Sequence, residues 1–500
     1  QALVLEGLSE AITPHEYQRS AVARALNEPT VLLDHVVGAG KTGSMIMSAM
    51  ELRRSGVARK PWVVVPNHLV EQTAAEWATW YPGANVMTIP TGSDKRARAR
   101  YVAASAAGDW DAVIVPQSVF ERIGIDRSRA RQWAAEEIAD LRANTEARTE
   151  QQTKKVERQV KAIENRFDDY LSKRDAGLPF ESTGCDYLIV DEAHHFKNLA
   201  RVSDYPELAC SPGSKRAWDL DFKLRALREA KLEAAQRAGL DTTSYRPAVA
   251  MFATGTPVAN QLSEMWVMQR YLQPEVLDEL GLNTVDSWAR TFTTSSTKME
   301  IGPDGSTWRL KDRVNRIVNA PELIGLVGRF TDRVDQSMVT AQLPELHGGQ
   351  RQVMTEPAAE EVAQYVQDLA HRANNLPEDP AEDNLLKISH EGRMIALDPR
   401  TLGLPALADG GRVQQVAEAV MSIHQENEHN VYTDATGAPS PIPGGFQLVF
   451  CDRSTPQDDG SFSVYQALAD ELVNLGMSRE KIAFIHDADD DEARAELFSK

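Results

Sequence analysis

The chain has 500 residues, with 42% hydrophobic and 25% charged side chains, which is the balance of an ordinary folded globular protein. This composition excludes a collagen-like, mucin-like or wholly disordered chain, and the length predicts about three domains. No apolar run approaches the roughly 18 residues that a membrane-spanning helix needs, so we expect no membrane contact. The three cysteines lie far apart, which excludes a disulfide framework and a CxxC metal site.

Charge is distributed unevenly along the chain. The 54 basic and 73 acidic residues give a net charge of −19, which argues against a protein that coats nucleic acid or binds it as a histone does. Residues 93–174 are an exception to this acidic balance. They contain 17 basic and 14 acidic residues, a net charge of +3, so the rest of the chain carries −22. Phosphate binding depends on local charge, so a basic groove on an acidic chain can still hold DNA.

Short apolar strands alternate with helices in the first half of the chain. We expect strands at 30–33, 61–66, 110–115, 186–190 and 249–253. Short buried strands separated by helices are typical of a parallel sheet that helices cover on both faces. The predicted fold class is therefore α/β.

A helical insertion interrupts this pattern at about residues 128–177, which are rich in Ala, Arg, Glu, Gln and Lys. Its second half spaces apolar residues by 4, 3, 4 and 4 positions, close to a coiled-coil seam, at Val156, Val160, Ile163, Phe167 and Leu171. This spacing predicts a helical hairpin. The hairpin either braces the sheet domain or contacts DNA directly, and its sequence leaves both roles open.

The second half of the chain is more mixed. A strand hairpin is expected at 299–301 and 307–310, around a turn that begins at Gly302, and a linker at 343–349. Beyond the linker we expect two helices and two strands, at 358–372, 464–475, 447–450 and 482–485. The predicted domains are 1–270, 271–345 and 346–500.

A glycine turn between the first strand and the next helix carries the first chemical signal, in the run HVVGAGKT from His35 to Thr42. A strand, a turn and a helix with GKT at the corner aim backbone N–H groups at a phosphate. Lys41 would supply charge to the terminal phosphates, and the Thr42 hydroxyl would bind Mg²⁺. The predicted nucleotide-binding positions are Gly38, Ala39, Gly40, Lys41 and Thr42. A glycine-rich turn in an α/β core stays the alternative, since His35 stands where the full pattern has glycine.

A later apolar strand ends in the carboxylates of Asp191 and Glu192, which open the run DEAH. Asp191 would face Mg²⁺ at the sheet edge, and Glu192 would orient or deprotonate the attacking water. An exposed acidic strand end is the simpler alternative for this segment alone. Together with the upstream GKT turn, however, the pair indicates nucleotide hydrolysis with Mg²⁺ as cofactor.

A third strand end carries the hydroxyls of Thr254 and Thr256, in the run TGTP. These hydroxyls can bond the DEAH carboxylates and would then couple the nucleotide state to a domain cleft. The alternative is a hydroxyl-stabilised turn before a helix.

DEAH followed by FKN, and TGTP followed by Asn260, Leu262 and Glu264, resemble the Snf2-type branch of helicase superfamily 2. The stretches 37–42, 64–72 and 393–400 are similar to the helicase part of phage- and plasmid-borne proteins that fuse an N6-adenine DNA methyltransferase to such a motor. The resemblance covers most of residues 10–500. It implies a P-loop NTPase with tandem RecA-like domains, ATP and Mg²⁺ as cofactors and double-stranded DNA as partner. It further implies a linked or associated methyltransferase module and a cytoplasmic location in a bacterial or phage-infected host.

The resemblance also assigns site residues. Tyr17 and Gln18 resemble the Q motif, in which Gln18 would recognise adenine. Motifs Ia, Ib and IV, which would touch the DNA backbone, correspond to Pro66, Asn67, Gln117, Ser118, Asp452 and Ser454. Contact with phosphates carries no sequence information, which suits a motor that moves over any DNA.

Two family features do not occur in the sequence, a glycine-rich motif V and a motif VI with arginine fingers. We therefore expect the second RecA-like domain to be cut off near its middle, and this fragment to bind ATP but to turn it over poorly. The leading interpretation is an ATP-dependent double-stranded DNA translocase that serves restriction, anti-restriction or mobile-element DNA processing. The alternatives are a strand-separating helicase and an ATP-gated DNA-binding scaffold without useful turnover.

Overall fold

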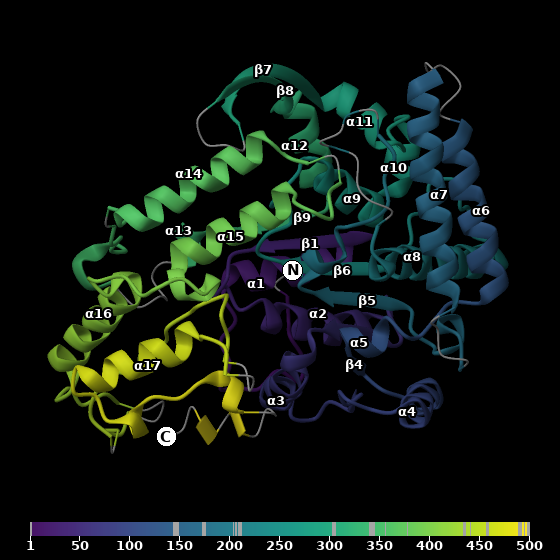
Figure 1. Cartoon of the computed structure of the whole chain (residues 1–500). Coiled ribbons are helices and arrows are strands. Elements are labelled where there is room, and N and C mark those ends of the chain that lie inside the picture. The colour runs from purple at the N-terminus through teal and green to yellow at the C-terminus, as the bar shows by residue number, and fades with distance from the viewer. Residues whose placement is uncertain are drawn as a thin grey trace. The chain divides into compact units, whose positions relative to one another are not determined.

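Figure 1 shows the computed structural model, which describes residues 3–497 except 144–149, 173–176, 204, 206–207, 209–212, 303–306, 340–345, 356, 378, 434–436, 441, 457–459, 489–492 and 495. The chain divides into two compact units. Unit 1 comprises Gln1–Thr297 and Asp312–Glu345, and unit 2 comprises Lys298–Lys311 and Leu346–Lys500. The three-part division expected from the sequence stays a prediction.

Unit 1 is built on a seven-stranded sheet whose paired strands are all parallel, in the order β3-β4-β2-β5-β6-β1-β9 (Figure 1). The strands are β1 (Thr30–His35), β2 (Pro61–Val65), β3 (Val86–Thr88), β4 (Ala112–Pro116), β5 (Tyr187–Asp191), β6 (Ala250–Thr254) and β9 (Thr331–Val334). The five predicted strands and the α/β class are confirmed. The sequence does not predict β3 and β9, because each is short and neither stands out as an apolar run.

Helices cover both faces of this sheet. They are α1 (Glu16–Asn27), α2 (Lys41–Ser55), α3 (Val70–Trp80), α4 (Lys95–Ala107), α5 (Gln117–Phe120), α6 (Arg127–Ala143), α7 (Glu150–Ser172), α8 (Lys215–Arg237), α9 (Ser263–Leu272), α10 (Pro274–Glu279), α11 (Val285–Phe292), α12 (Ala320–Gly328) and α13 (Gln336–Val339). Short 3₁₀ turns lie at Asn67–Leu69, Phe180–Ser182 and Ala193–Phe196. None of the helices in the described part of the chain is long and apolar enough to cross a membrane.

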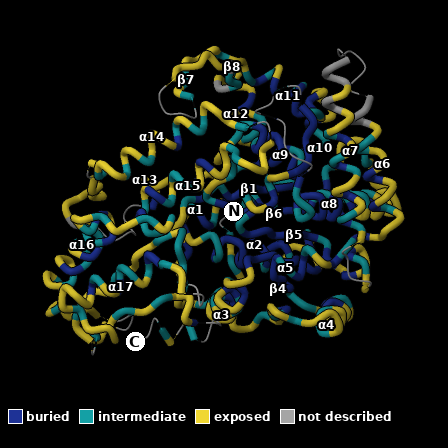
Figure 2. The backbone as a smooth tube through the Cα atoms, in the orientation of Figure 1, coloured by how far each residue is buried: buried dark blue, intermediate teal, exposed yellow. Residues whose placement is uncertain are grey.

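Side chains alternate along each strand, so the sheet carries a separate core on each face. Val63 of β2 lies in a core with Trp77 of α3 and with side chains of α1 and α2. Its neighbour Val64 lies in the other core, with Trp218 of α8 and side chains of α5, α6, α7 and α9. The inner strands β2, β4, β5 and β6 are accordingly buried along their whole length (Figure 2).

The insertion between β4 and β5 forms the two helices α6 and α7, so the predicted helical hairpin is confirmed. The seam residues Val160, Ile163 and Phe167 are buried in the same core as the sheet, and Leu171 packs against it. The side chain of Val156 lies outside the described residues. The seam thus attaches the insertion to the sheet domain, whereas the predicted DNA contact of the insertion stays untested.

A buried polar cluster fixes the base of α7. The Tyr170 hydroxyl donates to Asp219 Oδ1 at 3.2 Å, and Lys223 Nζ lies 2.5 Å from Asp219 Oδ2. Lys223 Nζ also donates to the carbonyl of Phe120 at 2.5 Å, and neither side chain of the ion pair is exposed. Phe120 ends α5, so the cluster ties the insertion to the short helix that begins at Gln117.

The predicted strand hairpin is confirmed as a second, two-stranded sheet of β7 (Thr293–Ile301) and β8 (Trp308–Ile317). Its outer part, Lys298–Lys311, is assigned to unit 2 and its base to unit 1. The tip of the turn, residues 303–306, lies outside the described residues.

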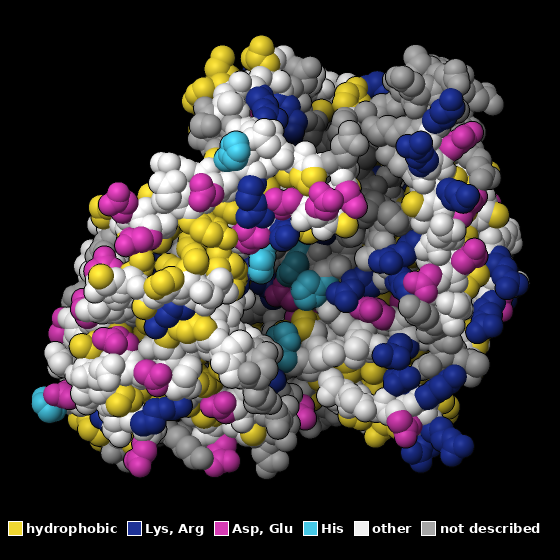
Figure 3. Space-filling model, viewed as in Figure 1, with side chains coloured by type: hydrophobic (Ala, Val, Ile, Leu, Met, Phe, Trp, Pro, Cys, Tyr) yellow, Lys and Arg dark blue, Asp and Glu magenta, His cyan; other side chains and the backbone are white. Residues whose placement is uncertain are grey.

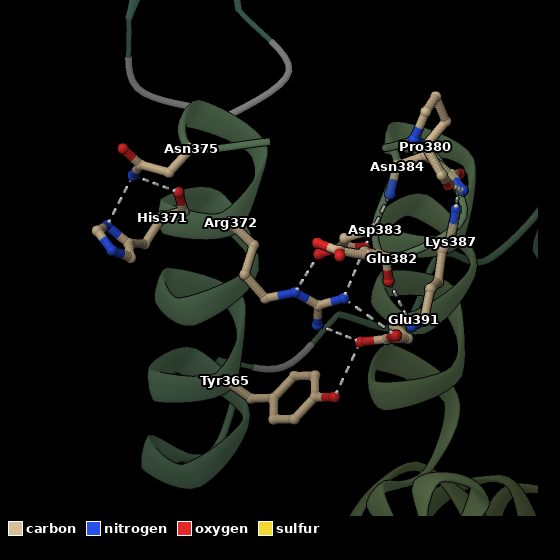
Figure 4. Close-up of polar contacts among 10 residues, drawn as sticks. All are labelled: Tyr365, His371, Arg372, Asn375, Pro380, Glu382, Asp383, Asn384, Lys387 and Glu391. Atoms are coloured by element: carbon tan, nitrogen blue, oxygen red, sulfur yellow. Dashed lines mark hydrogen bonds and ion pairs between the residues drawn. The ribbon is translucent and has the colours of Figure 1, made fainter. Parts of the chain in front are cut away.

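Unit 2 is otherwise helical, with α14 (Glu360–Asn374), α15 (Leu385–Leu397), α16 (Gly411–Asn427) and α17 (Val464–Asn474). Arg372 joins the first two helices, because its guanidinium contacts Asp383 at 2.8 Å and Glu391 at 2.5 Å (Figure 4). The Tyr365 hydroxyl donates to Glu391 as well. The hydrogen bonds from Arg372 lower the pKa values of both carboxyls, despite partial desolvation of each.

The strands predicted at 447–450 and 482–485 are wrong, since neither segment is a strand in the structure. Strand geometry requires a neighbouring strand for backbone pairing, and none is described beside these segments. Phe450 is 87% exposed, which is unusual for a residue of an apolar run. A parallel sheet in the second RecA-like domain therefore stays a prediction.

Candidate functional site

The loop after β1 has the geometry that its glycines predict. Gly38 and Gly40 have φ values of 89° and 67°, a backbone region that disfavours residues with a Cβ. The turn ends at Lys41, where α2 begins, so the unpaired N–H groups of the first helical turn face the loop. Lys41 Nζ lies 3.1 Å from the carbonyl of His35 and 3.5 Å from that of Val36. The ammonium group thus sits over the loop in which a phosphate would be bound.

Gln18 of α1 supports this loop. Its Nε2 donates to the Gly40 carbonyl at 3.0 Å, and its Oε1 accepts from the His15 N–H at 2.9 Å. A Cβ at Gly40 would lie only 2.7 Å from Gln18 Nε2, so a larger residue there would displace the Gln18 amide from the loop. The ring of Tyr17 stacks on His15, with 5.2 Å between the ring centroids. The structure places both Q-motif residues beside the loop, and adenine recognition by Gln18 stays a prediction.

His35, which stands where the full phosphate-loop pattern has glycine, has a structural role in this protein. Its fully buried ring places Nε2 2.7 Å from Asp332 Oδ1, and Asp332 belongs to β9. Since β1 and β9 are paired in the sheet, this contact reinforces the edge on which the loop rests. The sequence did not predict this pair, because 297 positions separate the two residues.

The two carboxylates after β5 have different environments. Asp191 is only 5% exposed, and its Oδ1 accepts from the backbone N–H of Glu192 at 2.9 Å. Burial, with the nearby charge of Glu192 as a smaller cause, raises the pKa of Asp191 to about 6. Glu192 has a left-handed backbone with a φ of 49°, which is uncommon for a residue with a Cβ, and its side chain is 31% exposed.

His194 joins the DEAH segment to the third strand end. Its Nδ1 lies 2.9 Å from Glu192 Oε2 and 3.0 Å from Thr254 Oγ1. The Thr254 hydroxyl also accepts from the backbone N–H of Thr256 at 3.1 Å. The predicted coupling of these hydroxyls to the carboxylates therefore runs through His194 and not through a direct bond.

The motif Ia and Ib residues lie at the same edge of the sheet, after β2 and β4. Gln117 Nε2 donates to the Asp191 carbonyl at 3.1 Å, and its Oε1 lies 3.0 Å from His195 Nδ1. Asn67 Oδ1 accepts from the Ser118 N–H at 3.2 Å. Gln117 is buried, as is Pro66, whereas Asn67 is exposed. The side chain of Gln117 is thus used inside the protein, and the residues of this group that reach the surface are Asn67 and Ser118.

Glu264 receives three hydrogen bonds behind the TGTP turn. Its Oε2 accepts from the N–H groups of Ala259 at 2.7 Å and Asn260 at 3.2 Å, and Lys197 Nζ donates to it at 3.2 Å. Burial would raise the pKa of Glu264, but these hydrogen bonds outweigh it and lower the pKa. Lys197 follows the DEAH run, so this ion pair is a second link between β5 and β6 that the motifs alone do not reveal.

The predicted ligands for Mg²⁺ are the Thr42 hydroxyl, in the first turn of α2, and the Asp191 carboxylate, at the end of β5. Carboxylate and hydroxyl oxygens suit this cation, and a positive charge beside Asp191 would offset the desolvation that raises its pKa. These two residues therefore fit the ion. Asp452 and Ser454 lie in unit 2, where Ser454 Oγ accepts from the N–H of Val464 at the start of α17.

Asp191→Asn is expected to stabilise unit 1 at neutral pH. In the folded protein the pKa of Asp191 is about 6, above the ordinary 3.8, so between these values the folded state holds the proton more tightly than the unfolded state. Stability is therefore lost as the pH rises from about 4 to 6, by up to about 3 kcal/mol. Thermal unfolding without Mg²⁺ should show a steeper fall of Tm for the wild type than for the variant. Parallel pH profiles would contradict this.

A parallel sheet with GKT after β1, paired carboxylates after β5 and hydroxyls after β6 defines a helicase-type nucleotide-binding motor domain. The model of the family described as "Probable helicase domain" matches residues 25–334. The chain belongs to this family.

Similarity to individual proteins is more distant. The chain is 30% identical to the Homo sapiens protein "Lymphoid-specific helicase" over 115 residues, which are 23% of this chain and 9% of that protein. It is similar to "Sulfolobus solfataricus SWI2/SNF2 ATPase core in complex with dsDNA" with 14% identity and a TM-score of 0.36, covering 84% of this chain and 66% of the other. It is also similar to "Sulfolobus solfataricus SWI2/SNF2 ATPase core domain", with 12% identity and a TM-score of 0.34. That match covers 83% of this chain and 61% of the other. The chain thus spans less than two thirds of each of these proteins.

Proposed function

We propose that the chain is the core of an ATP-dependent translocase on double-stranded DNA, which hydrolyses ATP to move along or remodel DNA. One observation carries the proposal. Contacts at a single sheet edge run from Thr254 through His194 to the DEAH carboxylates, from Asp191 to Gln117, and from the adjoining Ser118 to Asn67. The nucleotide end and the surface end of this edge are thereby one connected group of hydrogen bonds.

In this proposal the side chains at the nucleotide end have the following tasks. Lys41 exchanges its two carbonyl contacts for the terminal phosphate oxygens, which attract the ammonium group more strongly. Glu192 orients the attacking water, and His194 holds the Glu192 carboxylate in place at 2.9 Å. Mg²⁺, held by Thr42 and Asp191, would neutralise charge on the phosphates.

The DNA end includes a basic helix terminus. Since β3 is parallel to its neighbour and α4 follows it, α4 begins at the same sheet edge as Asn67. Its first residues include the exposed Lys95, Arg96 and Arg100, and Lys and Arg side chains gather over α4 in Figure 3. The N-terminus of a helix carries partial positive charge, so cations in the first turn add to a positive field that attracts phosphates. Asp94 caps this turn and offsets part of that field.

Phosphate release without DNA, with duplex DNA and with single strands tests the proposal. We expect the largest stimulation with duplex, and duplex affinity should fall steeply with salt because phosphate contacts release counterions. Arg96→Glu should weaken duplex binding about 10-fold at low salt. The matched control is Arg237→Glu, which reverses an exposed charge at the far end of α8 and should bind as the wild type does. If duplex binding did not depend on salt, or if both variants lost equal affinity for duplex DNA, the start of α4 would not be part of a DNA-binding surface.

Two substrates separate the translocase from its alternatives. A translocase on duplex DNA displaces a third strand from a triplex and leaves a forked duplex paired, whereas a strand-separating helicase unwinds the fork. A DNA-binding scaffold does neither and shows no stimulated phosphate release. We favour triplex displacement, because the motif Ia and Ib residues are expected to touch the DNA backbone, which suits a motor that moves along intact duplex of any sequence.

We also propose a setting for the motor. The similarity of stretches 37–42, 64–72 and 393–400 to phage- and plasmid-borne fusion proteins supports a role in restriction, anti-restriction or mobile-element DNA processing. It likewise supports a linked or associated DNA methyltransferase as partner and a location in the cytoplasm of a bacterial or phage-infected host. Co-purification of methyltransferase activity with the full-length protein tests this setting.

A further inference from the structure

The hairpin of β7 and β8 has one apolar and one charged face. A short connection joins the strands, so they run antiparallel, and the Gly302 N–H donates to the Thr307 carbonyl at 2.6 Å. This register sets Ile301 opposite Trp308 and Met299 opposite Leu310 on one face. On the other face it sets Lys298 opposite Lys311 and Glu300 opposite Arg309.

The apolar face is unusually exposed. The exposed fractions are 62% for Met299, 56% for Ile301, 62% for Trp308 and 73% for Leu310. All nine tryptophans of the chain lie within the described residues, and Trp308 is the one that is classed as exposed. Contiguous exposed apolar side chains of this size mark a binding surface more often than a solvated one.

Charge indicates which partner the surface fits. Residues 293–317 contain five basic and three acidic residues, a net +2 in a chain of net −19. At the top of Figure 3, where Figure 1 places β7 and β8, hydrophobic side chains stand beside Lys and Arg. An exposed indole next to cationic side chains suits nucleic acid, because bases stack on aromatic rings while phosphates attract the cations.

We propose that this hairpin is a wedge for DNA in which a base pair is exposed, such as a fork or a junction. Trp308 and Ile301 pack on the exposed base pair, and Lys298, Arg309 and Lys311 face the phosphates of the strand that leaves it. The inference rests on the proposed DNA-dependent function and adds the kind of DNA that the motor engages.

Binding to two DNAs tests the wedge. One is a forked duplex, and the other is a closed duplex minicircle, which exposes no base pair. Trp308→Ala should lower affinity for the fork about 10-fold and leave the minicircle unaffected. Trp308→Phe keeps an aromatic ring and should bind the fork as the wild type does. The matched control is Leu240→Ala, which removes another exposed apolar side chain, 60% exposed in the loop after α8, and should change neither affinity.

Tryptophan fluorescence gives a second readout. Stacking on a base quenches indole emission, so saturating fork should quench the wild type more than Trp308→Phe, and the minicircle should quench both equally. The wedge is overturned if the fork quenches the wild type and Trp308→Phe equally, or if Trp308→Ala loses the same affinity for both DNAs. Either result would assign the apolar face to a protein partner. Failure of the wild type to bind the minicircle would instead contradict the proposed function, since that DNA does not depend on the wedge.

Discussion

Lys41→Ala is expected to lose nucleotide binding, with the Kd for ATP rising about 100-fold, or about 2.7 kcal/mol. Lys41 is the cation whose ammonium group lies over the phosphate loop, within 3.1 Å of the His35 carbonyl. Its removal leaves the backbone N–H groups of the turn without a positively charged side chain beside the terminal phosphates. Titration with a fluorescent ATP analogue measures the change.

The control for this variant is its fold. The described contacts of Lys41 Nζ are with two backbone carbonyls of its own loop, so the Tm should stay close to that of the wild type. Arg237→Ala, which removes a cation from an exposed helix end, should bind ATP normally. An unchanged Kd in Lys41→Ala would mean that the loop after β1 is only a glycine-rich turn.

In a protein that includes motifs V and VI, Glu192→Gln should keep ATP and DNA binding and lower the rate of phosphate release by about 10²–10⁴-fold relative to the wild type. The glutamine amide has the size of the carboxylate, and its oxygen can still accept a hydrogen bond from His194 Nδ1. In the wild type this nitrogen lies 2.9 Å from Glu192 Oε2. It cannot accept the proton of the attacking water, so only the chemical step is lost. Single-turnover phosphate release with prebound ATP isolates that step.

His194→Ala is the informative companion of Glu192→Gln. It keeps the Glu192 carboxylate itself but removes the contact that holds it, at 2.9 Å, and the bridge to Thr254, at 3.0 Å. We expect it to lower basal phosphate release less than Glu192→Gln does and to lose the stimulation by DNA. Full turnover by Glu192→Gln would reassign the base to another group at this edge.

The sequence was most informative where the chemistry is local. Five strands were predictable because each is a compact apolar run, and the loop after β1 because Gly38 and Gly40 need the left-handed backbone that glycine permits. The strand ends then place Asp191 and Thr254 at one edge, since parallel strands share the direction of their carboxyl ends. Hence the position of the site follows from the pattern alone.

The remaining contacts depend on the fold. The bond between His35 and Asp332 joins strands that are far apart in the sequence, and β9 offers no apolar run to predict. For Gln117 the sequence indicates the edge but not the direction of the side chain, which turns inward to Asp191. In the segment around Phe450 the apolar pattern predicts a strand, but a strand also needs a neighbour, and the described part of unit 2 contains none beside it.

The buried pair of Asp219 and Lys223 bears on how such a domain can be shortened or grafted. Two charges without solvent are tolerated only while each has its partners, which here include Tyr170 from the insertion and the Phe120 carbonyl from α5. Excising α6 and α7 would take away Tyr170 and open the apolar core to water. The insertion therefore cannot be deleted without changes elsewhere in the domain. A version of the motor without α6 and α7 would need Asp219 and Lys223 replaced by apolar residues at the same time.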